Sequence, residues 1–574
     1  MTRTSALAWA WSLVRLDFAG VAFAAIFFCL SLTPSLLPRD WIIGGVIGGI
    51  NAAIGYGIGV LAGALVRMSV RGRHWWPLPR RWRYTLRTGV VALSVGACLL
   101  MVLPAAAWQR QIAAITGSEG PATMQYLRVV VVAVVLGAVL IAAARLIRDV
   151  ITALARLMIR RWHLDNEVAM FIGTAIVVVL AVTLINGVLV RGLLAGASTV
   201  FQPRNTATRP GVEQPQQSEK TGSPASFASW DSLGFQGRNF VGTGPGAAEL
   251  TELNGRPAKE PIRIYAGLQS ASSTEARVAV LLSELQRTRA FDRRLLVIIP
   301  TTGTGWVDPV AARSIESIYN GDTALVAMQY SYLPSWISFL ADRDKSVDAG
   351  RAMVDGIHRR WLQWPAERRP QLALYGESLG SMAGQGAFGF LPDVEDLGFT
   401  SVLWVGPPNS SYLWQALTRR RDPGTPQVQP RYDNGRTVRF AQASSPEEIA
   451  AVAAKPPWNR TRVLFLQHAS DPVVWWSPDL LLRKPDWLDE PPGFDRSPAM
   501  RWYPIITFWQ VSADMAGNVT NSTGTPEGHG HNYGDSQLDG WVAVAAPEGW
   551  TRVDTDRIRR SLEKLIAAGG PEFA

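Results

Sequence analysis

The stretch QLALYGESLGSMAG, Gln371 to Gly384, decides how the second half of this chain is interpreted. Its first part is an apolar run typical of a buried β-strand, and its second part has the small residues of a closely packed helix. Ser378 lies between them in the pattern Gly-x-Ser-x-Gly, which forms a nucleophile elbow when a strand precedes it and a helix follows. The stretch therefore predicts a nucleophilic serine, with an ordinary serine in a glycine-rich loop as the alternative.

Strand-like and helix-like segments alternate on both sides of this stretch. Apolar runs predict strands at 262–268, 294–300, 324–332, 371–376, 400–406 and 461–469. Periodic segments predict helices at 273–290, 308–319, 346–361 and 554–567. This alternation predicts an α/β domain with a mostly parallel, doubly wound sheet, whose ligands bind at the carboxyl ends of the strands.

A serine hydroxyl becomes a nucleophile only when a neighbouring base takes its proton. Two of the six histidines lie in the glycine-rich segment EGHGHNYG, Glu527 to Gly534. The pattern Gly-x-Gly-His-Asn favours His531 as the base and leaves His529 as the second choice. A His-x-His metal site with Asp535 is the alternative, but the sequence offers no convincing third ligand, so neither a metal nor a cofactor is predicted. The other histidines flank apolar segments or lie within a predicted helix or strand: His74, His163, His358 and His468.

An imidazole base needs a carboxylate that fixes its tautomer. Asp471, in QHASDPVV, follows the last predicted strand and is the candidate, although an aspartate before a proline is also common in turns. Ser378, Asp471 and His531 then follow one another in the order Ser…Asp…His of the α/β-hydrolase fold.

Backbone donors for a developing oxyanion are predicted at two places. Leu379 follows the serine and opens the next helix, where its N–H can face an anion. Thr302 and Gly303, in the segment IIPTTGTGW, follow an earlier strand. A plain glycine turn explains that second segment equally well.

The first half of the chain has the composition of a membrane protein. Hydrophobic residues make up 48% of the 574 residues and charged residues 18%, a balance that predicts a membrane part joined to a soluble part. Five apolar segments are near the length of a membrane span: 18–37, 41–67, 88–108, 129–144 and 168–190. The predicted domains are a transmembrane domain at 1–200, a flexible linker rich in Pro, Gln, Ser, Thr and Gly at 201–256, and an α/β-hydrolase domain at 257–574.

The charge distribution predicts the orientation of these segments. The chain carries a formal net charge of +10, and its arginines cluster in the loop after the second apolar segment and in the loop after the fourth. Positive loops stay cytoplasmic, so five spans place the N-terminus in the cytoplasm and the α/β domain outside, in a multi-pass protein of the plasma (inner) membrane. The arginines serve this topology, and no nucleic-acid partner is expected. The only cysteines, Cys29 and Cys98, lie in apolar segments and predict neither a disulfide framework nor a thiol nucleophile.

The chain resembles a bacterial, actinobacterial-type family of membrane-anchored α/β-hydrolases. The resemblance rests on the multi-span region and on YSYLPSW (Tyr330 to Trp336), GESLGS, QHASDPVVWW and GHGHNYG, and it covers the chain to about Gly534. It implies a Ser378, Asp471 and His531 triad and an activity like that of an esterase, lipase or thioesterase. It leaves the substrate and any protein partners open.

Five tryptophans between Asp471 and His531 bear on the substrate: Trp475, Trp476, Trp487, Trp502 and Trp509. They suit an acyl-binding cleft or lid, a structural cap, or a position at the membrane interface. With membrane lipids close by, we expect a lipid or cell-envelope ester as substrate. An acyltransferase that uses the same residues and a non-catalytic membrane scaffold are the alternatives.

Overall fold

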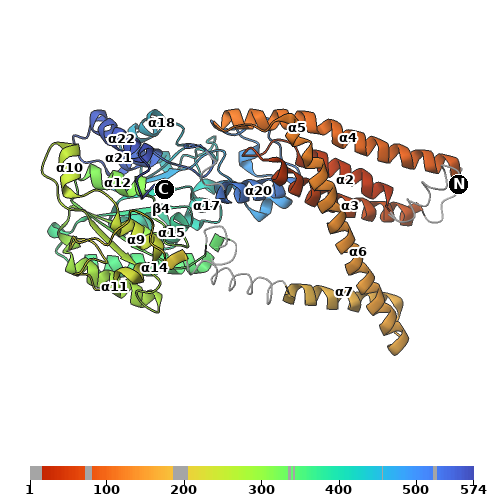
Figure 1. Ribbon diagram of the computed structural model, residues 1–574, viewed down its shortest axis with the longest axis horizontal. Coiled ribbons are helices and arrows are strands. Elements are labelled where there is room, and N and C mark those ends of the chain that lie inside the picture. Colours follow the sequence, from red (N-terminus) through yellow and green to blue (C-terminus); the bar gives the residue numbers. More distant parts are fainter. Residues whose placement is uncertain are drawn as a thin grey trace. The chain divides into compact units, whose positions relative to one another are not determined.

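The structure is a computed structural model that describes residues 16–70, 80–184, 204–333, 338–339, 343–455, 457–520 and 526–573 (Figure 1). The chain divides into two compact units. The first unit consists of residues 1–190, 478–488 and 496–521, and the second of residues 191–477, 489–495 and 522–574. Two short pieces from the second half of the chain thus fold with the N-terminal helices.

A seven-stranded, entirely parallel sheet forms the centre of the second unit, in the order β1-β3-β2-β4-β5-β7-β6. The strands are β1 (Ile262–Ala266), β2 (Leu295–Pro300), β3 (Thr323–Met328), β4 (Gln371–Glu377), β5 (Phe399–Val405), β6 (Val438–Ala441) and β7 (Arg462–Leu466). The predicted doubly wound α/β fold is confirmed. The sequence did not predict β6, because a run of four residues that includes Arg439 gives little apolar signal.

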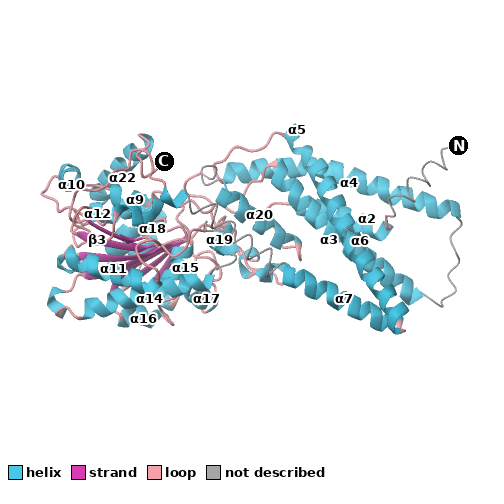
Figure 2. Ribbon diagram, turned by 60° about the horizontal axis from the view of Figure 1, so that its bottom comes forward, coloured by secondary structure: helices cyan, strands magenta, loops and turns pink. Residues whose placement is uncertain are grey.

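Two groups of helices cover the two faces of this sheet (Figure 2). The first group contains α11 (Thr274–Arg287), α14 (Arg343–Leu362), α15 (Leu379–Gln385), α16 (Leu391–Asp396) and α17 (Tyr412–Arg419). The second contains α12 (Pro309–Ile318), α18 (Pro446–Ala454), α21 (Ser536–Ala545) and α22 (Arg552–Ala567). Strand side chains alternate between the faces, so Leu295, Val297 and Ile299 join one core cluster with residues of α12 and α21.

Residues 204–256 differ from the expected flexible linker. They contain η2 (Trp230–Leu233), α9 (Gly234–Gly242) and α10 (Ala247–Asn254). Thr221 N–H donates to the carbonyl of Arg263, the second residue of β1, across 3.0 Å. Leu233 and Phe240 belong to the core cluster of the sheet. The polar composition suggested a linker, but the few apolar residues are spaced so that they pack on the sheet. Residues 201–203 lie outside the described part.

The first unit is built mainly from apolar helices of different lengths. These are α2 (Phe18–Ser31), α3 (Trp41–Val70), α4 (Arg80–Ile115), α5 (Thr123–Tyr126), α6 (Arg128–Trp162) and α7 (Asn166–Thr183). Four helical segments are long and apolar enough to cross a bilayer, which indicates a membrane protein: Trp41–Ser69, Thr85–Ile115, Thr123–Trp162 and Asn166–Thr183.

The first predicted span is shorter than expected. Helix α2 has 14 residues, which span about 21 Å, whereas a bilayer core is about 30 Å thick. The segment Leu32–Leu37 leaves the helix and is buried as a loop. The last predicted span runs to Val190, and its residues after Leu184 lie outside the described part, as do Arg71 and Arg73 of the first basic loop.

Small residues let α2 and α3 pack closely. A side chain at Gly59 would lie 2.3 Å from the carbonyl oxygen of Ala19, and one at Gly55 would lie 2.6 Å from that of Phe23. Such close backbone approach is typical of helix pairs in membranes, where packing replaces the hydrophobic effect as the driving force.

Helix α20 (Ile506–Thr520), from the second half of the chain, is anchored in the first unit by a buried ion pair. Asp514 is 3.0 Å from Nε of Arg39 and accepts the N–H of Leu36 across 3.0 Å, and it also accepts the hydroxyl of Ser35. The Gln510 amide donates to the carbonyls of Ser31 and Thr33. Because a buried charge needs a partner, these contacts fix α20 on the loop between α2 and α3.

Candidate active site

Ser378 occupies a strained turn between β4 and α15. Its φ of 53° and ψ of −124° lie in a region that residues with a side chain rarely adopt, and such a conformation costs about 1–3 kcal/mol. Two glycines make the turn possible, since a side chain at Gly376 would lie 2.5 Å from the Gly380 carbonyl oxygen. The N–H of Ser378 donates to the Val405 carbonyl across 2.9 Å, which fixes the turn at the end of β5. This is the geometry of a nucleophile elbow.

The two predicted groups of oxyanion donors lie close together. A side chain at Gly380 would lie 2.4 Å from the Pro300 carbonyl oxygen and 3.3 Å from the carbonyl carbon of Thr301, so the start of α15 packs against the end of β2. Leu379 and Thr302 therefore adjoin the same strand ends, and both are buried. Gly303 is enclosed by Ser338 and by the Leu333 carbonyl, and its own carbonyl accepts the N–H of Ser331.

Asp471 is fully buried just after β7 and accepts three hydrogen bonds. One oxygen accepts the N–H of Val473 across 2.8 Å, at the start of α19 (Pro472–Trp475). The other lies 2.7 Å from Nδ1 of His531 and 2.7 Å from the hydroxyl of Tyr533. Such a set of donors fixes the position of the carboxylate.

His531 packs against Gly406, the residue after β5. A side chain at Gly406 would lie 2.7 Å from Cε1 of the imidazole, so glycine leaves the space that the ring fills. Nδ1 faces Asp471, and a proton on Nδ1 would leave Nε2 as the acceptor. Within the described ranges, Nε2 is buried and has no hydrogen-bond partner. The backbone N–H of Ser378 donates to Val405, and the His531 ring packs on Gly406. Two adjacent residues at the end of β5 therefore contact both the serine and the histidine.

Opposing effects act on the pKa of His531. Burial lowers it, but the negative charge of Asp471 and the hydrogen bond to it have the larger combined effect. The pKa of the imidazole is therefore raised above its ordinary value.

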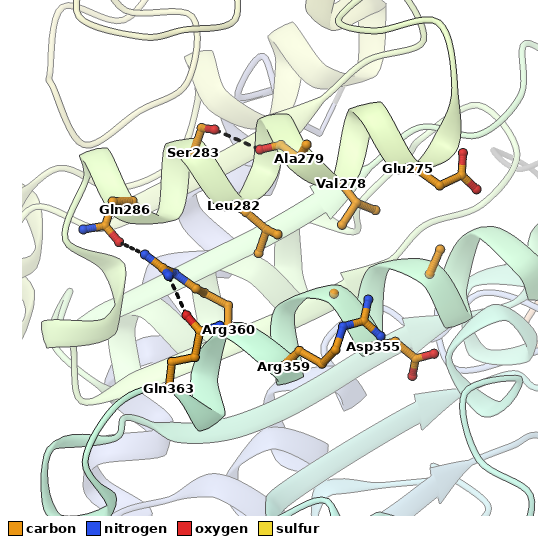
Figure 3. A pocket seen from close by; sticks show the side chains of 12 residues that line it. Glu275, Val278, Ala279, Leu282, Ser283, Gln286, Asp355, Arg359, Arg360 and Gln363 are labelled. Atoms are coloured by element: carbon orange, nitrogen blue, oxygen red, sulfur yellow. Dashed lines mark hydrogen bonds between the residues drawn. The ribbon is translucent and has the colours of Figure 1, made fainter.

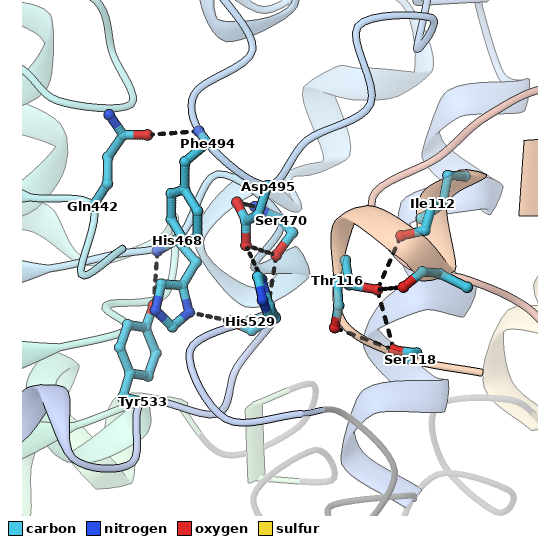
Figure 4. Close-up of polar contacts among 12 residues, drawn as sticks. Ile112, Thr116, Ser118, Gln442, His468, Ser470, Phe494, Asp495, His529 and Tyr533 are labelled. Carbon is cyan, nitrogen blue, oxygen red and sulfur yellow. Dashed lines mark hydrogen bonds and ion pairs between the residues drawn. The ribbon is translucent and has the colours of Figure 1, made fainter. Parts of the chain in front are cut away.

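His529 points to a different aspartate (Figure 4). Its Nδ1 lies 3.3 Å from Asp495, whose other contacts are the backbone N–H of Ser470, across 2.9 Å, and the Ser470 hydroxyl. The two histidines of GHGH thus have separate carboxylate partners, and the His-x-His segment does not converge on one point. The expected alternative of a metal held by both imidazoles and Asp535 does not fit this arrangement.

Three residues after β7 hold the loop that carries both histidines. His468 Nδ1 lies 2.8 Å from the Gly530 carbonyl, and the Ser470 hydroxyl accepts the Gly530 N–H across 2.8 Å. Asp471 binds His531. His468 also stacks on Tyr533 with ring centroids 4.1 Å apart, and burial lowers the pKa of His468. The expected packing role of His468 agrees with these contacts, although β7 ends two residues earlier.

Sequence reasoning missed two buried acids beside the elbow. Glu377 is the variable residue of Gly-x-Ser-x-Gly, and Asp308 caps the start of α12 by accepting the Ala311 N–H across 2.9 Å. Both are buried. A glutamate in a short motif carries no signal of its own burial, so only the packing of α12 and α21 around it reveals the pair.

The five tryptophans between Asp471 and His531 divide between the two units. Trp475 and Trp476 belong to the second unit and Trp487, Trp502 and Trp509 to the first. Trp475 is 1% exposed and donates its indole N–H to the His468 carbonyl, and Trp487 is 3% exposed. Burial of this degree favours a structural role for these two side chains.

A groove of about 690 Å³ lies elsewhere on the second unit, between α11 and α14 (Figure 3). Val278 and Leu282 line it together with Arg359 and Arg360. None of its lining residues belongs to the cluster around Ser378, so the groove is separate from the candidate site.

Comparison with protein-family models assigns both halves of the chain. Residues 262–558 match the model described as the alpha/beta-hydrolase family, and residues 32–245 match the one described as the alpha/beta-hydrolase family N-terminus. Searches of curated proteins and of solved structures find no significant match. The first match covers more than half of the chain, includes every candidate residue around Ser378 and agrees with the parallel sheet, so the chain belongs to the alpha/beta-hydrolase family.

Proposed function

We propose that the protein is a membrane-anchored serine hydrolase that cleaves a lipid or cell-envelope ester or thioester through an acyl-enzyme. The hydrogen bond between Asp471 and His531, at the strand ends where Ser378 forms its strained turn, is the observation that carries this proposal. Family membership supports the hydrolase class. The ester substrate and the roles of these residues are inferred from their chemistry.

The proposed reaction has two acyl-transfer steps. Ser378 Oγ attacks the ester carbonyl while its proton passes to Nε2 of His531, and Asp471 stabilises the imidazolium. The backbone N–H groups of Leu379 and Thr302 stabilise the oxyanion. The leaving alcohol or thiol takes the proton from His531. Water then attacks the acyl-serine and gives its proton to His531, which returns it to Ser378 Oγ as the carboxylic acid leaves.

A membrane-borne substrate is supported by the way the segment between Asp471 and His531 folds. Helix α20 lies between Asp471 and His531 in sequence, yet it folds with the apolar helices through the pair of Arg39 and Asp514. The chain around the candidate site is therefore tied to the membrane unit at a second point besides residues 191–203. Such tethering raises the effective concentration of an ester that lies in the bilayer.

The position of α20 also supports an extracytoplasmic hydrolase. Its partners Ser31 to Arg39 form the nearly neutral loop between α2 and α3. Arginine-rich segments lie toward the other ends of these helices: Arg87 lies over Phe18 at the start of α2, and Arg145 lies over Tyr56 in the second half of α3. Since positive loops stay in the cytoplasm, α20 is assigned to the opposite side. The side assigned to α20 is the same whether or not α2 crosses the bilayer.

Covalent labelling tests the proposed chemistry. The full-length protein in detergent is treated with a fluorophosphonate probe, which reacts with activated serines, and is compared with Ser378→Ala and Ser381→Ala. Ser381 is a buried serine of α15 that bonds Gln385 and serves as the matched control. We expect labelling of the wild type and of Ser381→Ala, and none of Ser378→Ala. Labelling that persists in Ser378→Ala, or a folded wild type that never reacts, would favour a scaffold.

Two further experiments address the substrate and the membrane side. Esters of graded chain length and lipid extracts are offered to the wild type and to Ser378→Ala, with water or an added alcohol as acceptor. Preferential transfer to the alcohol would favour an acyltransferase over a hydrolase. A reporter that is active only outside the cytoplasm, fused after Ala574, is expected to be active. Activity of a cytoplasmic reporter instead would contradict the proposed side.

A further inference from the structure

We propose that Arg343, the first residue of α14, binds the phosphate group of a lipid ester whose acyl carbonyl lies at Ser378, so that the preferred substrate is an anionic phospholipid. The choice of ester rests on the proposed function, whereas the anion site itself does not. The inference depends on where Arg343 lies and on what its guanidinium contacts.

The first turn of α14 lies beside the nucleophile elbow. The hydroxyl of Ser346 donates to the carbonyl of Leu379, the residue after the nucleophile, across 3.3 Å. One turn further along, a side chain at Gly350 would meet the carbonyl oxygen of Ala383, so α14 runs alongside α15 in the same direction (Figure 1). Arg343 lies on the same face of α14 as Ser346, one turn earlier. It therefore lies past the first residue of α15, beside the turn that presents the nucleophile.

Two aromatic rings connect Arg343 with other loops of the candidate site. Phe339 follows Ser338, which encloses Gly303 in the segment after β2. Trp476 follows α19, the short helix that begins after the acid of the proposed triad. The rings of Phe339 and Trp476 meet edge to face with centroids 5.6 Å apart, and both are buried. Two loops at the carboxyl ends of the strands thus meet at this pair of rings.

The guanidinium of Arg343 lies over both rings. Its central carbon is 4.3 Å from the ring centroid of Phe339 and 5.9 Å from that of Trp476, and Nε donates to the Phe339 carbonyl. Within the described part of the chain, Nη1 and Nη2 have neither a hydrogen bond nor an ion pair. Stacking on aromatic faces holds the planar group in place, so the remaining N–H groups are preorganised for a ligand.

Other arginines of the second unit have their charge or their donors satisfied inside the fold. Arg263 forms a buried, two-pronged pair with Glu316, across 2.8 and 2.7 Å. Arg439 donates to backbone carbonyls through both Nε and Nη1. Asp344, next to Arg343, is exposed and forms no ion pair with it in the described ranges. Burial lowers the pKa of Arg343, and a cation that is partly withdrawn from water gains from an anionic partner.

The geometry of the free N–H groups favours an oxyanion as the ligand. A guanidinium pairs with the two oxygens of a phosphate or carboxylate at once. In a glycerophospholipid, only the glycerol unit separates the phosphate from the acyl esters. The phosphate can therefore meet Arg343 while an ester carbonyl lies at the neighbouring Ser378. A neutral ester would leave the guanidinium without this partner.

Matched substrates test the effect on activity. The full-length protein in detergent is offered a short-chain phosphatidylglycerol and the diacylglycerol with the same acyl chains. We expect Arg343→Met to lower kcat/KM about 10–100-fold for the phospholipid, mainly through KM, and less than about threefold for the diacylglycerol. Arg343→Lys keeps the charge without the planar donor pair and should lie between Arg343→Met and the wild type.

Arg351→Met is the matched control for this experiment. Arg351 lies on the same helix, and its Nε also donates to a backbone carbonyl, that of Gly386, across 3.0 Å. The ratio of kcat/KM for the two lipids should be that of the wild type in this variant. An Arg343→Met or Arg343→Lys protein that labels with the fluorophosphonate probe and keeps the wild-type ratio would overturn the role of Arg343 in substrate choice.

Binding to an inactive variant separates the anion site from the proposed function. The Tm of Ser378→Ala is measured with each lipid and with inorganic phosphate. We expect the phospholipid to raise Tm more than the diacylglycerol, and this difference to vanish when Arg343→Met is added. Equal rises for the two lipids would overturn the site. A rise with phosphate alone as large as with the phospholipid would assign Arg343 to a free anion and overturn the lipid ligand.

The same measurements distinguish the two possible failures. A wild type that never reacts with the fluorophosphonate probe, but whose Tm responds to the phospholipid through Arg343, would contradict the proposed function and leave the anion site standing. A wild type that reacts with the probe, but does not distinguish the two lipids in kcat/KM or in Tm, would leave the hydrolase standing and overturn the anion site.

Discussion

His529 and His531 lie two residues apart on one loop, and each faces a buried aspartate, but their surroundings differ. His531 meets Asp471 at 2.7 Å, packs on Gly406 at the end of β5 and keeps Nε2 buried without a partner among the described residues. His529 meets Asp495 at 3.3 Å, and its side chain is 21% exposed. The comparison teaches that an Asp–His contact alone does not identify a base, because the ring must also direct its second nitrogen to the nucleophile.

Replacing the histidines should give the largest difference between the two pairs. We expect His531→Ala to reduce kcat/KM for a chromogenic ester by about 10³-fold or more, since the base is lost. His529→Ala should change it by less than about fivefold, since that ring faces Asp495 and not Asp471. Steady-state kinetics of both variants measures this. A greater loss in His529→Ala, with unchanged Tm, would exchange the two assignments.

Replacing the two aspartates should give a difference in activity in the same direction as replacing the histidines, but a smaller one. Asp471→Asn is expected to lower kcat by about 10²–10⁴-fold, because an amide no longer stabilises the imidazolium. Asp495→Asn should lower it by less than about tenfold and act mainly on stability, because Asp495 holds Ser470 and the loop. Equal losses in kcat, with both proteins folded, would contradict the distinction.

The acid side of the pH profile should sharpen the comparison further. His531 acts as a base only when neutral, so activity rises with pH as this imidazole loses its proton. The pKa of His531 is raised by Asp471, so this rise should lie above about pH 6.5 in the wild type. In Asp471→Asn it should move to lower pH, because the charge of Asp471, which raises the pKa of His531, is lost while burial still lowers it. The profile of His529→Gln should match that of the wild type.

The smallest effects are expected from the hydroxyl groups that support each aspartate. Tyr533→Phe removes a hydrogen bond of 2.7 Å to Asp471 and should reduce kcat a few-fold. Ser470→Ala removes the contacts to Asp495 and to the Gly530 N–H and should destabilise the fold by about 1–2 kcal/mol. The acid rise of the pH profile should stay in place for Ser470→Ala. Chemical denaturation and kcat of the two variants provide the measurements. A shift in the acid rise of the pH profile of Ser470→Ala would contradict separate roles for the two Asp–His pairs.

Most of the fold can be predicted from local pattern. The strands around Val297, Leu374 and Leu464 are apolar runs between periodic helices, and parallel pairing follows from that alternation. The exceptions are segments with weak local signal. Strand β6 is short, and residues 204–256 are polar, so tertiary contacts decide their structure. Helix α2 is shorter than its apolar sequence predicts, because the loop from Leu32 is buried against α20.

The candidate site also has a part that can be predicted from the sequence and a part that cannot. The elbow glycines, Ser378 and the order of Asp471 and His531 can be read in the sequence, because each follows a recognisable strand or loop. The sequence does not reveal the hydrogen bonds between Ser470 and Asp495, or the two buried acids Asp308 and Glu377. They join residues that lie 25 and 69 positions apart and become neighbours only when the helices pack.

The sequence by itself determined an apolar helical half, an alternating α/β half and a serine on a strand–turn–helix, since each depends on residues close together in the chain. Only the tertiary structure decided which histidine adjoins the end of β5, where α20 is anchored, and which acids are buried beside Ser378. The physical reason is that desolvation and charge pairing depend on neighbours in space, and a short motif does not contain these neighbours.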